Sequence, residues 1–172
     1  MNININDIKN KNILFLQGPM SSFFKKKQLI LHRNNSIFRI GFNKGDEFYS
    51  LKEGFYPYRD TPQRWRIFIN LFLKNKKIKI IFLFGDCRFY HKIAIQEAKK
   101  LNIDAYVFEE GYIRPNYITL EKNGVNYFSE IRKKKSEILN QTEIKDINLF
   151  DERNNFSRKY TFLKMAFQSF LY

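Results

Sequence analysis

The 172-residue sequence holds little of the material from which cross-links or metal sites are made: one cysteine and two histidines. Cys87 alone cannot form a disulfide within the chain, and one thiol with two imidazoles falls short of a structural zinc quartet. No apolar run approaches the roughly 18 residues of a membrane span. The start, MNININDIKNKN, lacks the apolar core of a signal peptide. We therefore expect a cytoplasmic protein without a metal site.

Signature motifs of several large protein classes are also missing. The sequence has no GxGxxG dinucleotide fingerprint, Walker phosphate loop, GxSxG nucleophile elbow or HExxH zinc motif. It contains neither a zinc finger nor the basic-aromatic pattern of RNA-recognition domains. We therefore expect no cofactor and no nucleic-acid partner, although the charge of the chain would permit the latter.

Basic residues, by contrast, are plentiful. Lys and Arg number 31 against 17 Asp and Glu, for a net charge of +14, with local clusters at 25–27, 74–77 and 132–135. A surplus of this sign favours anionic partners, such as acidic lipid headgroups or phosphorylated and carboxylated substrates. The clusters fit either solvated helix ends and loops or contact with anionic lipid.

Hydrophobic periodicity predicts alternating strands and helices. We expect strands at 12–16, 36–42, 78–84 and 104–108; helices at 21–32, 61–72 and 90–101; a turn at 43–46 and a loop at 47–60; and a hairpin of 117–120 with 125–128. Such alternation predicts an α/β fold with a Rossmann-like, mostly parallel sheet and right-handed crossovers. The helix at 21–32 should turn four residues inward, namely Phe23, Phe24, Leu29 and Ile30.

The composition changes along the chain, which suggests a division into segments. We expect a polar tail at 1–11, the Rossmann-like domain at 12–129, a polar linker at 130–156 and a C-terminal helical arm at 157–172. Ligands of open α/β sheets bind beyond the carboxyl ends of the strands, so the residues that follow each strand are the candidate site.

Polar and charged side chains do follow the predicted strands. The candidates are Gln17 and Gly18 after the first strand, Asp86, Arg88 and His91 after the third, and Glu109, Glu110, Gly111 and Arg114 after the fourth. Each has a plainer interpretation. Gly18 can simply turn the chain, Asp86 can cap a helix, and the arginines can form salt bridges with Asp86 and a nearby glutamate.

The adjacent carboxylates Glu109 and Glu110 are the strongest of these candidates. Successive strand residues point to opposite faces, so at most one of the two faces a crevice. Sugar transfer uses such carboxylates to manage charge at the anomeric centre and at the attacking hydroxyl. His91 is either a catalytic residue or an ordinary packing residue. Cys87 stands at a strand-to-helix junction, where a thiolate is favoured, but a cysteine hydrolase is the weaker hypothesis.

Five short stretches together resemble the N-terminal part of the KpsS/LipB-type capsule polysaccharide biosynthesis proteins. They occur in the family's order and spacing: FLQGPM at 15–20 with FF at 23–24, FNKGD at 42–46, LFGDCRFYH at 83–91, VFEEGYIRP at 107–115, and YITLE at 117–121 leading to GVN at 124–126. The resemblance implies a retaining glycosyltransferase that moves β-Kdo from the donor substrate CMP-Kdo to a phosphatidylglycerol-type lipid terminus. It also implies a two-domain GT-B fold, with this chain as the first Rossmann-like half.

The same resemblance implies roles for individual residues. Glu109 or Glu110 would be the acid/base carboxylate, and Arg88 and Arg114 would hold the Kdo carboxylate or a phosphate. Gln17, Asp86 and His91 would line the crevice, where Gly18 and Gly111 let the backbone approach the sugar. The implied location is cytoplasmic, peripheral to the inner face of the inner membrane, with the capsule assembly and export machinery as partner.

Length is where the sequence departs from the family. Family members carry a second domain with a His-Pro motif for the cytidine nucleotide and an aspartate that resembles the nucleophile, and this sequence has no His-Pro dipeptide. We therefore expect a fragment, a split gene product or a truncated reading frame, inactive alone and completed by a separately encoded C-terminal half. The alternative is a non-catalytic basic module that binds an acidic glycan, a lipid or an export complex.

Overall fold

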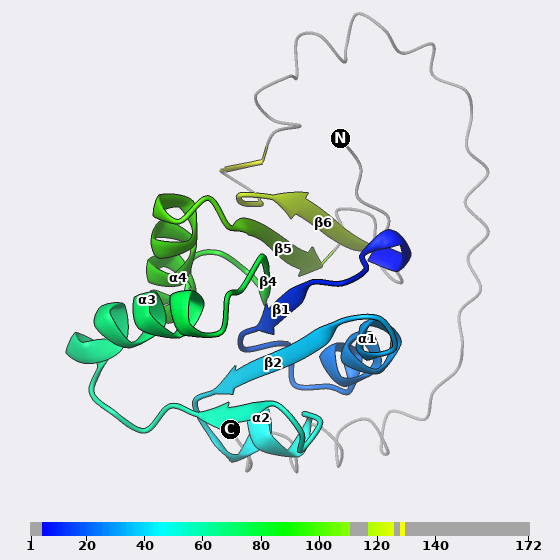
Figure 1. Cartoon of the computed structure of the whole chain (residues 1–172), viewed down its shortest axis with the longest axis horizontal. Coiled ribbons are helices and arrows are strands. Elements are labelled where there is room, and N and C mark those ends of the chain that lie inside the picture. Colours follow the sequence, from blue (N-terminus) through cyan, green and yellow to red (C-terminus); the bar gives the residue numbers. More distant parts are fainter. Residues whose placement is uncertain (1–4, 111–116, 126–127, 130–172) are drawn as a thin grey trace, which may run out of the picture.

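The computed structural model describes residues 5–110, 117–125 and 128–129 (Figure 1). Its elements, in chain order, are η1 (Ile5–Asp7), β1 (Asn12–Phe15), α1 (Phe23–His32), β2 (Ser36–Gly41), α2 (Lys44–Phe48), β3 (Phe55–Pro57), η2 (Pro62–Arg64), α3 (Trp65–Asn75), β4 (Ile80–Phe84), α4 (Phe89–Lys100), β5 (Asp104–Glu110) and β6 (Ile118–Lys122). The predicted α/β, Rossmann-like fold class is confirmed.

The sheet places the ends of β1 and β4 side by side at its centre. Its six strands have the order β3-β2-β1-β4-β5-β6, and all neighbours are parallel except β5 and β6. The strand order reverses between β1 and β4, because β1 leads outward to β2 and β4 leads outward to β5. In open α/β sheets this reversal is the point at which ligands bind, outside the carboxyl ends of the strands.

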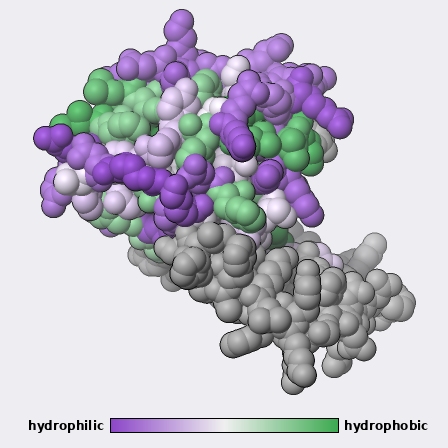
Figure 2. All heavy atoms as spheres, turned by 90° about the horizontal axis from the view of Figure 1, so that it is seen from below, coloured by the Kyte–Doolittle hydropathy of each residue, from purple (hydrophilic) through white to green (hydrophobic). Residues whose placement is uncertain are grey.

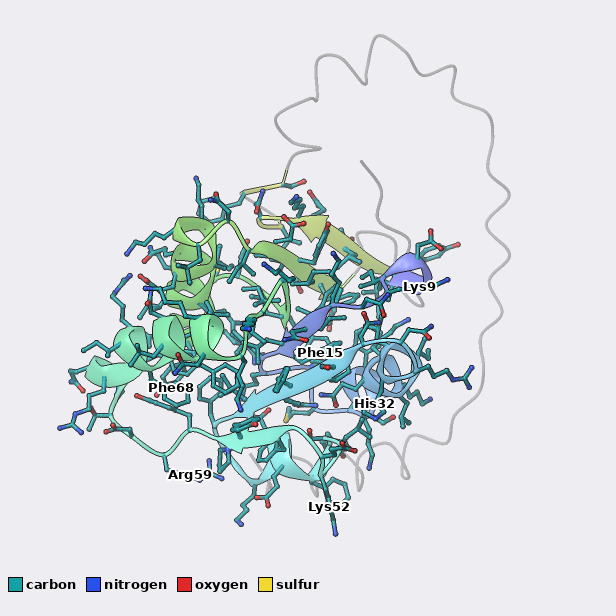
Figure 3. All side chains as sticks on the ribbon, viewed as in Figure 1. Lys9, Phe15, His32, Lys52, Arg59 and Phe68 are labelled. Carbon is teal, nitrogen blue, oxygen red and sulfur yellow. The ribbon has the colours of Figure 1, made fainter. Side chains whose placement is uncertain are left out.

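Two hydrophobic clusters lie on the two faces of the sheet. Helices α3 and α4 cover one face and α1 covers the other (Figure 1). Successive strand residues point to opposite faces, so along β4 Ile81 and Leu83 join the cluster under α3 and α4, whereas Phe82 joins the cluster under α1. Phe15 of β1 lies on the α1 side near the middle of the sheet, while Lys52 and Arg59 extend from its margin (Figure 3). The continuous apolar run of β4 is therefore explained by burial on both faces.

Helices α3 and α4 are joined by one buried aromatic residue and one buried carboxylate. The Trp65 indole is fully buried and donates Nε1–H to the Tyr90 carbonyl oxygen at 2.9 Å. Glu97, which is 3% exposed, accepts hydrogen bonds from Arg66, Asn70 and Lys100. Burial opposes its charge, but these donors outweigh burial and lower the pKa of Glu97 to about 2.

The predicted inward face of α1 is wrong in part. Leu29 and Ile30 were expected to face the core but are 52% and 48% exposed, and the buried residues of α1 are Phe24, Gln28 and Leu31. These three fall four and three residues apart, which is one face of a helix. The buried face of α1 therefore contains Phe24 and the amide side chain of Gln28, whereas the apolar pair Leu29 and Ile30 faces away from the core.

The predicted hairpin of 117–120 with 125–128 is also wrong. Strand β6 pairs antiparallel with β5, so that Glu109 lies opposite Thr119. Asn123, with a φ of 70°, then turns the chain away from the sheet, and Val125 lies in no strand. By pairing with β5, strand β6 joins a six-stranded sheet. A two-stranded hairpin on its own would lack the support of that sheet.

Two segments predicted as irregular contain regular structure. Residues 44–48, expected as part of a turn and a loop, form α2, and the loop expected at 47–60 includes β3, which pairs with β2. Asn43 is the N-cap of α2, because its side-chain oxygen accepts the Asp46 amide at 2.8 Å. Within the predicted tail, Ile8 is buried against the α1 side of the sheet. The predicted linker and C-terminal helix lie outside the described residues.

Charged and apolar side chains share the surface. Figure 2 shows hydrophilic residues interleaved with smaller apolar patches over one face. A cavity of about 170 Å³ lies near the amino ends of β1 and β2, between η1 and the end of α1, lined by Ile5, Ile8, Ile30, Leu31, Arg33, Asn34 and Asn35. It is therefore remote from the polar residues that follow the strands. No helix within the described ranges is long and apolar enough to cross a bilayer.

Candidate functional site at the carboxyl edge of the sheet

The carboxyl edge of the parallel strands gathers most of the predicted site residues. Gln17 follows β1, Asp86 and Arg88 follow β4, and Glu109 is near the end of β5. Gly111 and Arg114 lie outside the described residues. One hydrogen bond, from Arg88 Nη1 to Gln17 Oε1, joins the loop after β4 to the residues after β1, and Gly85 of the same loop lies beside Glu109.

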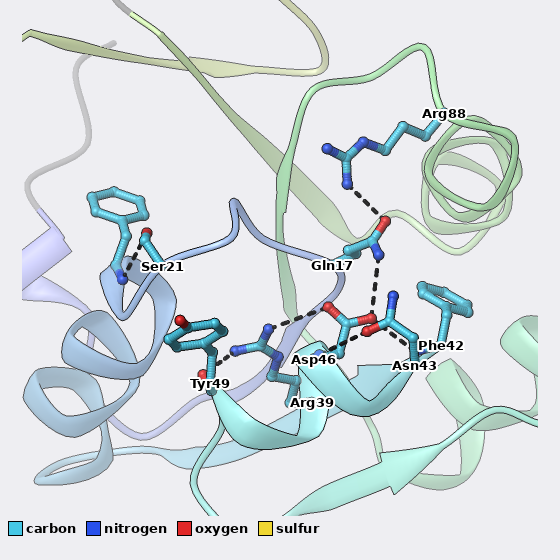
Figure 4. Close-up of polar contacts among 9 residues, drawn as sticks. Gln17, Ser21, Arg39, Phe42, Asn43, Asp46, Tyr49 and Arg88 are labelled. Carbon is cyan, nitrogen blue, oxygen red and sulfur yellow. Dashed lines mark hydrogen bonds and ion pairs between the residues drawn. The ribbon is translucent and has the colours of Figure 1, made fainter. Parts of the chain in front are cut away.

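A buried ion pair that the sequence analysis did not identify lies beneath this edge (Figure 4). Arg39 of β2 and Asp46 of α2 are 1% and 0% exposed, and Arg39 Nη2 stands 3.6 Å from Asp46 Oδ1. Arg39 Nη1 also donates to the Tyr49 carbonyl oxygen at 2.7 Å, and Asp46 Oδ2 accepts the Phe42 amide at 2.9 Å. Backbone groups thus add a hydrogen bond to each partner of the pair, and removing one partner would leave a buried charge uncompensated.

Gln17 connects the buried pair to the surface. Its Nε2 donates to Asp46 Oδ2 at 3.3 Å, and its Oε1 accepts from Arg88 Nη1 at 2.7 Å (Figure 4). Arg88 is exposed at the start of α4. The predicted salt bridge between Arg88 and Asp86 is therefore replaced by a bond to a neutral amide, which leaves the positive charge of Arg88 uncompensated by this partner.

Asp86 holds the loop after β4 to the turn after β6. The carboxylate is 6% exposed, and its Oδ2 accepts the Val125 amide at 2.9 Å. Its Oδ1 accepts from Cys87 Sγ at 3.2 Å, and this hydrogen bond, with the negative charge of Asp86, raises the pKa of the Cys87 thiol. Asp86 makes no side-chain cap to α4. The thiolate expected at Cys87 is therefore disfavoured.

His91 lies under the same loop, fully buried in the first turn of α4. Its Nδ1 is 2.8 Å from the Gly85 carbonyl oxygen, and its Nε2 has no hydrogen-bond partner among the described residues. Burial lowers the pKa of His91 to about 4, with the charge of Arg88 acting in the same direction. At neutral pH the imidazole is uncharged, so Nδ1 carries the proton donated to Gly85.

The two glutamates at the end of β5 differ in exposure. Glu109 is half-buried and Glu110 is exposed. Gly85 lies beside Glu109: a Cβ at Gly85 would be 3.7 Å from Glu109 Oε2, and Gly85 has a φ of +71°. The loop after β4 thus passes next to the Glu109 carboxylate, which brings a carboxylate and the base of the Arg88 loop to one place.

Gly18 is required by packing, in addition to any turn. It is buried, and a Cβ there would come within 2.7 Å of the Phe24 ring. The absence of a side chain lets the segment after β1 pass directly against Phe24 of α1.

The sequence analysis missed Arg39 and Asp46. Asp46 was interpreted as a turn residue, because it follows Asn43 and Gly45. A signal was present in β2, whose apolar run is interrupted by Arg39. A charged residue in the interior of a buried strand requires an opposite charge nearby, and Asp46 is the nearest acidic residue along the chain.

Comparison with known proteins places the chain in a family. The family described as capsule polysaccharide biosynthesis protein matches residues 79–170, more than half of the chain. The chain belongs to this family and is of the KpsS/LipB type. It is 36% identical over 140 residues to the capsule polysaccharide modification protein LipB of Neisseria meningitidis serogroup A and, equally, of serogroup B, and 35% identical over 125 residues to the capsule polysaccharide export protein KpsS of Escherichia coli.

The chain spans about a third of the length of these relatives. The matches cover 76% of this chain and 32% of each LipB protein, and 72% of this chain and 32% of KpsS. Among solved structures, a Listeria monocytogenes protein assigned as a UDP-N-acetylglucosamine 2-epimerase matches 61% of this chain and 31% of its own, with a TM-score of 0.44 and 13% identity. Family membership links the chain to capsule polysaccharide biosynthesis.

Proposed function

We propose that the chain forms the acceptor-side, N-terminal part of a retaining β-Kdo transferase, which moves Kdo from CMP-Kdo to a phosphatidylglycerol-type lipid terminus. The observation that supports this most is the carboxyl edge of the sheet, where Glu109 lies beside the loop that carries Arg88, at the reversal of strand order. A carboxylate and a guanidinium are the groups that transfer of an acidic sugar requires.

In this proposal CMP leaves first, as the nucleophile bonds to the anomeric carbon. The Glu109 carboxylate then accepts the proton of the acceptor hydroxyl as the hydroxyl oxygen bonds to that carbon and the bond to the nucleophile breaks. Glu110, which is exposed on the opposite side of the strand, is the second choice. Arg88, with Arg114, binds the Kdo carboxylate or a phosphate through its planar N–H groups. His91, whose imidazole is buried and neutral, has a positioning role: it holds Gly85 through the hydrogen bond to the Gly85 carbonyl oxygen. In this proposal the nucleotide-binding residues and the nucleophile are supplied from outside this chain, which spans about a third of the length of its relatives.

The test is Kdo transfer from CMP-Kdo to a phosphatidylglycerol-type acceptor, measured for the 172-residue chain and for a chimera in which this chain replaces the matching third of Escherichia coli KpsS. The chain alone should give no turnover, and the chimera should be active. Glu109→Gln in the chimera should reduce turnover by 10²-fold or more, the loss typical for an acid/base residue. Glu53→Gln, an exposed glutamate paired with His32, serves as the matched control and should keep full turnover.

Turnover by the isolated chain would contradict the proposal that this chain supplies only the acceptor side and needs residues from outside it for the nucleotide and the nucleophile. Full turnover of both Glu109→Gln and Glu110→Gln chimeras would exclude an acid/base role for either glutamate. An inactive chimera that binds CMP-Kdo would show that this chain cannot supply the acceptor side.

A non-catalytic binding module is the second candidate, and the net charge of +14 is the observation that favours it. In this version the chain lies against the inner face of the inner membrane, held by anionic lipid or by the capsule export machinery. Co-sedimentation with phosphatidylglycerol vesicles at rising salt tests it. Binding that falls with salt, and that is equal for the parent, Glu109→Gln and Glu110→Gln, together with an inactive chimera, would favour this candidate.

A further inference from the structure

We propose that Gln17 and Asp46 are positioning residues that aim the Arg88 guanidinium at an anionic group of the substrate. The inference rests on the function proposed above, because it takes Arg88 as the ligand of the substrate's carboxylate or phosphate. The distinguishing observation is the continuous chain of contacts from Arg39 through Asp46 and Gln17 to Arg88 (Figure 4).

Asp46 is the fixed end of this chain of contacts. It is fully buried, one carboxylate oxygen faces Arg39, and the other accepts the Phe42 amide at 2.9 Å. Its own amide is tied to the side chain of Asn43 at 2.8 Å. Contacts from Arg39 and Phe42 therefore hold the carboxylate, and Asn43 holds the backbone of Asp46, in an orientation that leaves Oδ2 directed at Gln17.

The carboxylate of Asp46 decides which way the Gln17 amide points. An ionised carboxylate only accepts hydrogen bonds, so the NH₂ group of Gln17 must face Asp46 and the amide oxygen must face away from it. The oxygen then accepts from Arg88 Nη1 at 2.7 Å. Because the two ends of the amide differ in polarity, a reversed amide would lose both contacts and would direct donors at a guanidinium.

A neutral partner leaves Arg88 able to bind an anion. Arg88 is exposed, and the Gln17 bond uses only one of the five N–H donors of its guanidinium. A carboxylate at position 17 would neutralise Arg88 and would also stand close to the Asp46 carboxylate. An amide instead fixes the direction of the side chain while its charge stays available for a bidentate contact with a carboxylate or phosphate.

The test uses the 172-residue chain with two probes, free Kdo for a sugar carboxylate and inorganic phosphate for a phosphate. Binding is measured by NMR titration of the arginine side-chain N–H signals. We expect Gln17→Met to weaken binding of the preferred probe about tenfold, the effect of losing one charge-assisted hydrogen bond. Gln17→Glu should weaken it further, although it preserves volume and polarity, and Arg88→Met should abolish it. Arg64→Met, at a largely exposed arginine that pairs with Asp60, is the control and should stay within twofold.

A second readout is independent of any ligand. The side-chain NH₂ signals of Gln17 should shift in Arg88→Met, because the amide loses its partner, and should stay in place in Arg64→Met. Fluorescence of the buried Trp65, the single tryptophan of the chain, confirms that each variant is folded.

The outcomes separate this inference from the proposed function. Parent-like binding by Gln17→Met, with binding lost in Arg88→Met, overturns the positioning role and leaves Arg88 as the anion ligand. Parent-like binding by Arg88→Met overturns both this inference and the role given to Arg88 above. Binding of phosphate but not of Kdo is consistent with the positioning role of Gln17 and Asp46 and contradicts recognition of the sugar carboxylate by Arg88. If the side-chain NH₂ signals of Gln17 do not shift in Arg88→Met, the positioning role is overturned, whichever probe the chain binds.

Discussion

Replacing His91 by Asn should remove an acid-sensitive part of the folding free energy. The asparagine amide can donate to the Gly85 carbonyl oxygen in place of Nδ1–H, but it does not titrate. Burial is the main reason that the pKa of His91 falls from 6.5 to about 4 in the folded chain. Between those two pH values the unfolded chain binds a proton at His91 and the folded chain does not, so acid favours unfolding.

The size of this effect follows from the two pKa values of His91. A difference of 2.5 units between 6.5 and about 4 corresponds to about 3 kcal/mol once both states are protonated, of which about 2.5 kcal/mol is expected at pH 4.5. A domain with a total stability of roughly 5–15 kcal/mol would lose a substantial share of it. Above pH 6.5 the contribution is fully present, and below about pH 4 it stops changing with pH.

Urea unfolding followed by Trp65 fluorescence at intervals from pH 7.5 to 4.5 measures the effect. The quantity to compare is the fall in unfolding free energy with acid, because His91→Asn also changes packing and lowers the baseline. His32→Asn is the control, since His32 is about half exposed and removing it should leave the acid-induced fall nearly unchanged. Equal falls for the parent and His91→Asn would refute the reasoning, and so would an NMR titration of His91 near pH 6.5.

Three further substitutions test other parts of the structure by thermal and urea unfolding. Glu97→Gln should remove about 2 kcal/mol of the stability lost between pH 4.5 and 2, because the folded-state pKa of Glu97 is about 2; an unchanged acid limb would contradict this. Gly54→Ala should destabilise the fold by about 2 kcal/mol or more, since Gly54 has a φ of +74° and a Cβ there would overlap the Ile37 carbonyl oxygen; a smaller loss would mean that β2 and β3 adjust. Asp86→Ala should cost about 2 kcal/mol by leaving the Val125 amide unpaired, whereas Asp86→Asn, which retains the acceptor, should cost much less; equal losses would exclude the hydrogen bond as the cause.

Strands buried on both faces were the most predictable part of the fold. The apolar run ending at Phe84 can satisfy its side chains only as a strand covered on both faces, and the chain places it there as β4. The α1 helix was predictable in position but not in its inward face, because Gln28 is buried beside Phe24 while Leu29 is exposed. Periodicity locates a helix, whereas the packing surface decides which of two adjacent faces is covered.

Pairings between distant segments account for most of what the sequence could not predict. Strand β6 carries an ordinary strand pattern, and that pattern alone does not distinguish β5 from residues 125–128 as its partner. The burial of Asp46 likewise depends on Arg39 in another element. Neither signal is local, so propensity and turn chemistry favoured the simpler interpretations.

The polar groups at the carboxyl edge divide by what already binds them, and this division supports the site proposed above. Asp86 is occupied by Val125 and Cys87, and His91 is buried against Gly85, so both hold the loop that follows β4. Arg88 meets a neutral amide, and its charge faces solvent. The amide at position 17 bonds to Arg88 without neutralising it, and it avoids a second carboxylate beside the buried Asp46. The presence of an amide there, anchored to a buried carboxylate, is what an arginine held ready for an external anion requires.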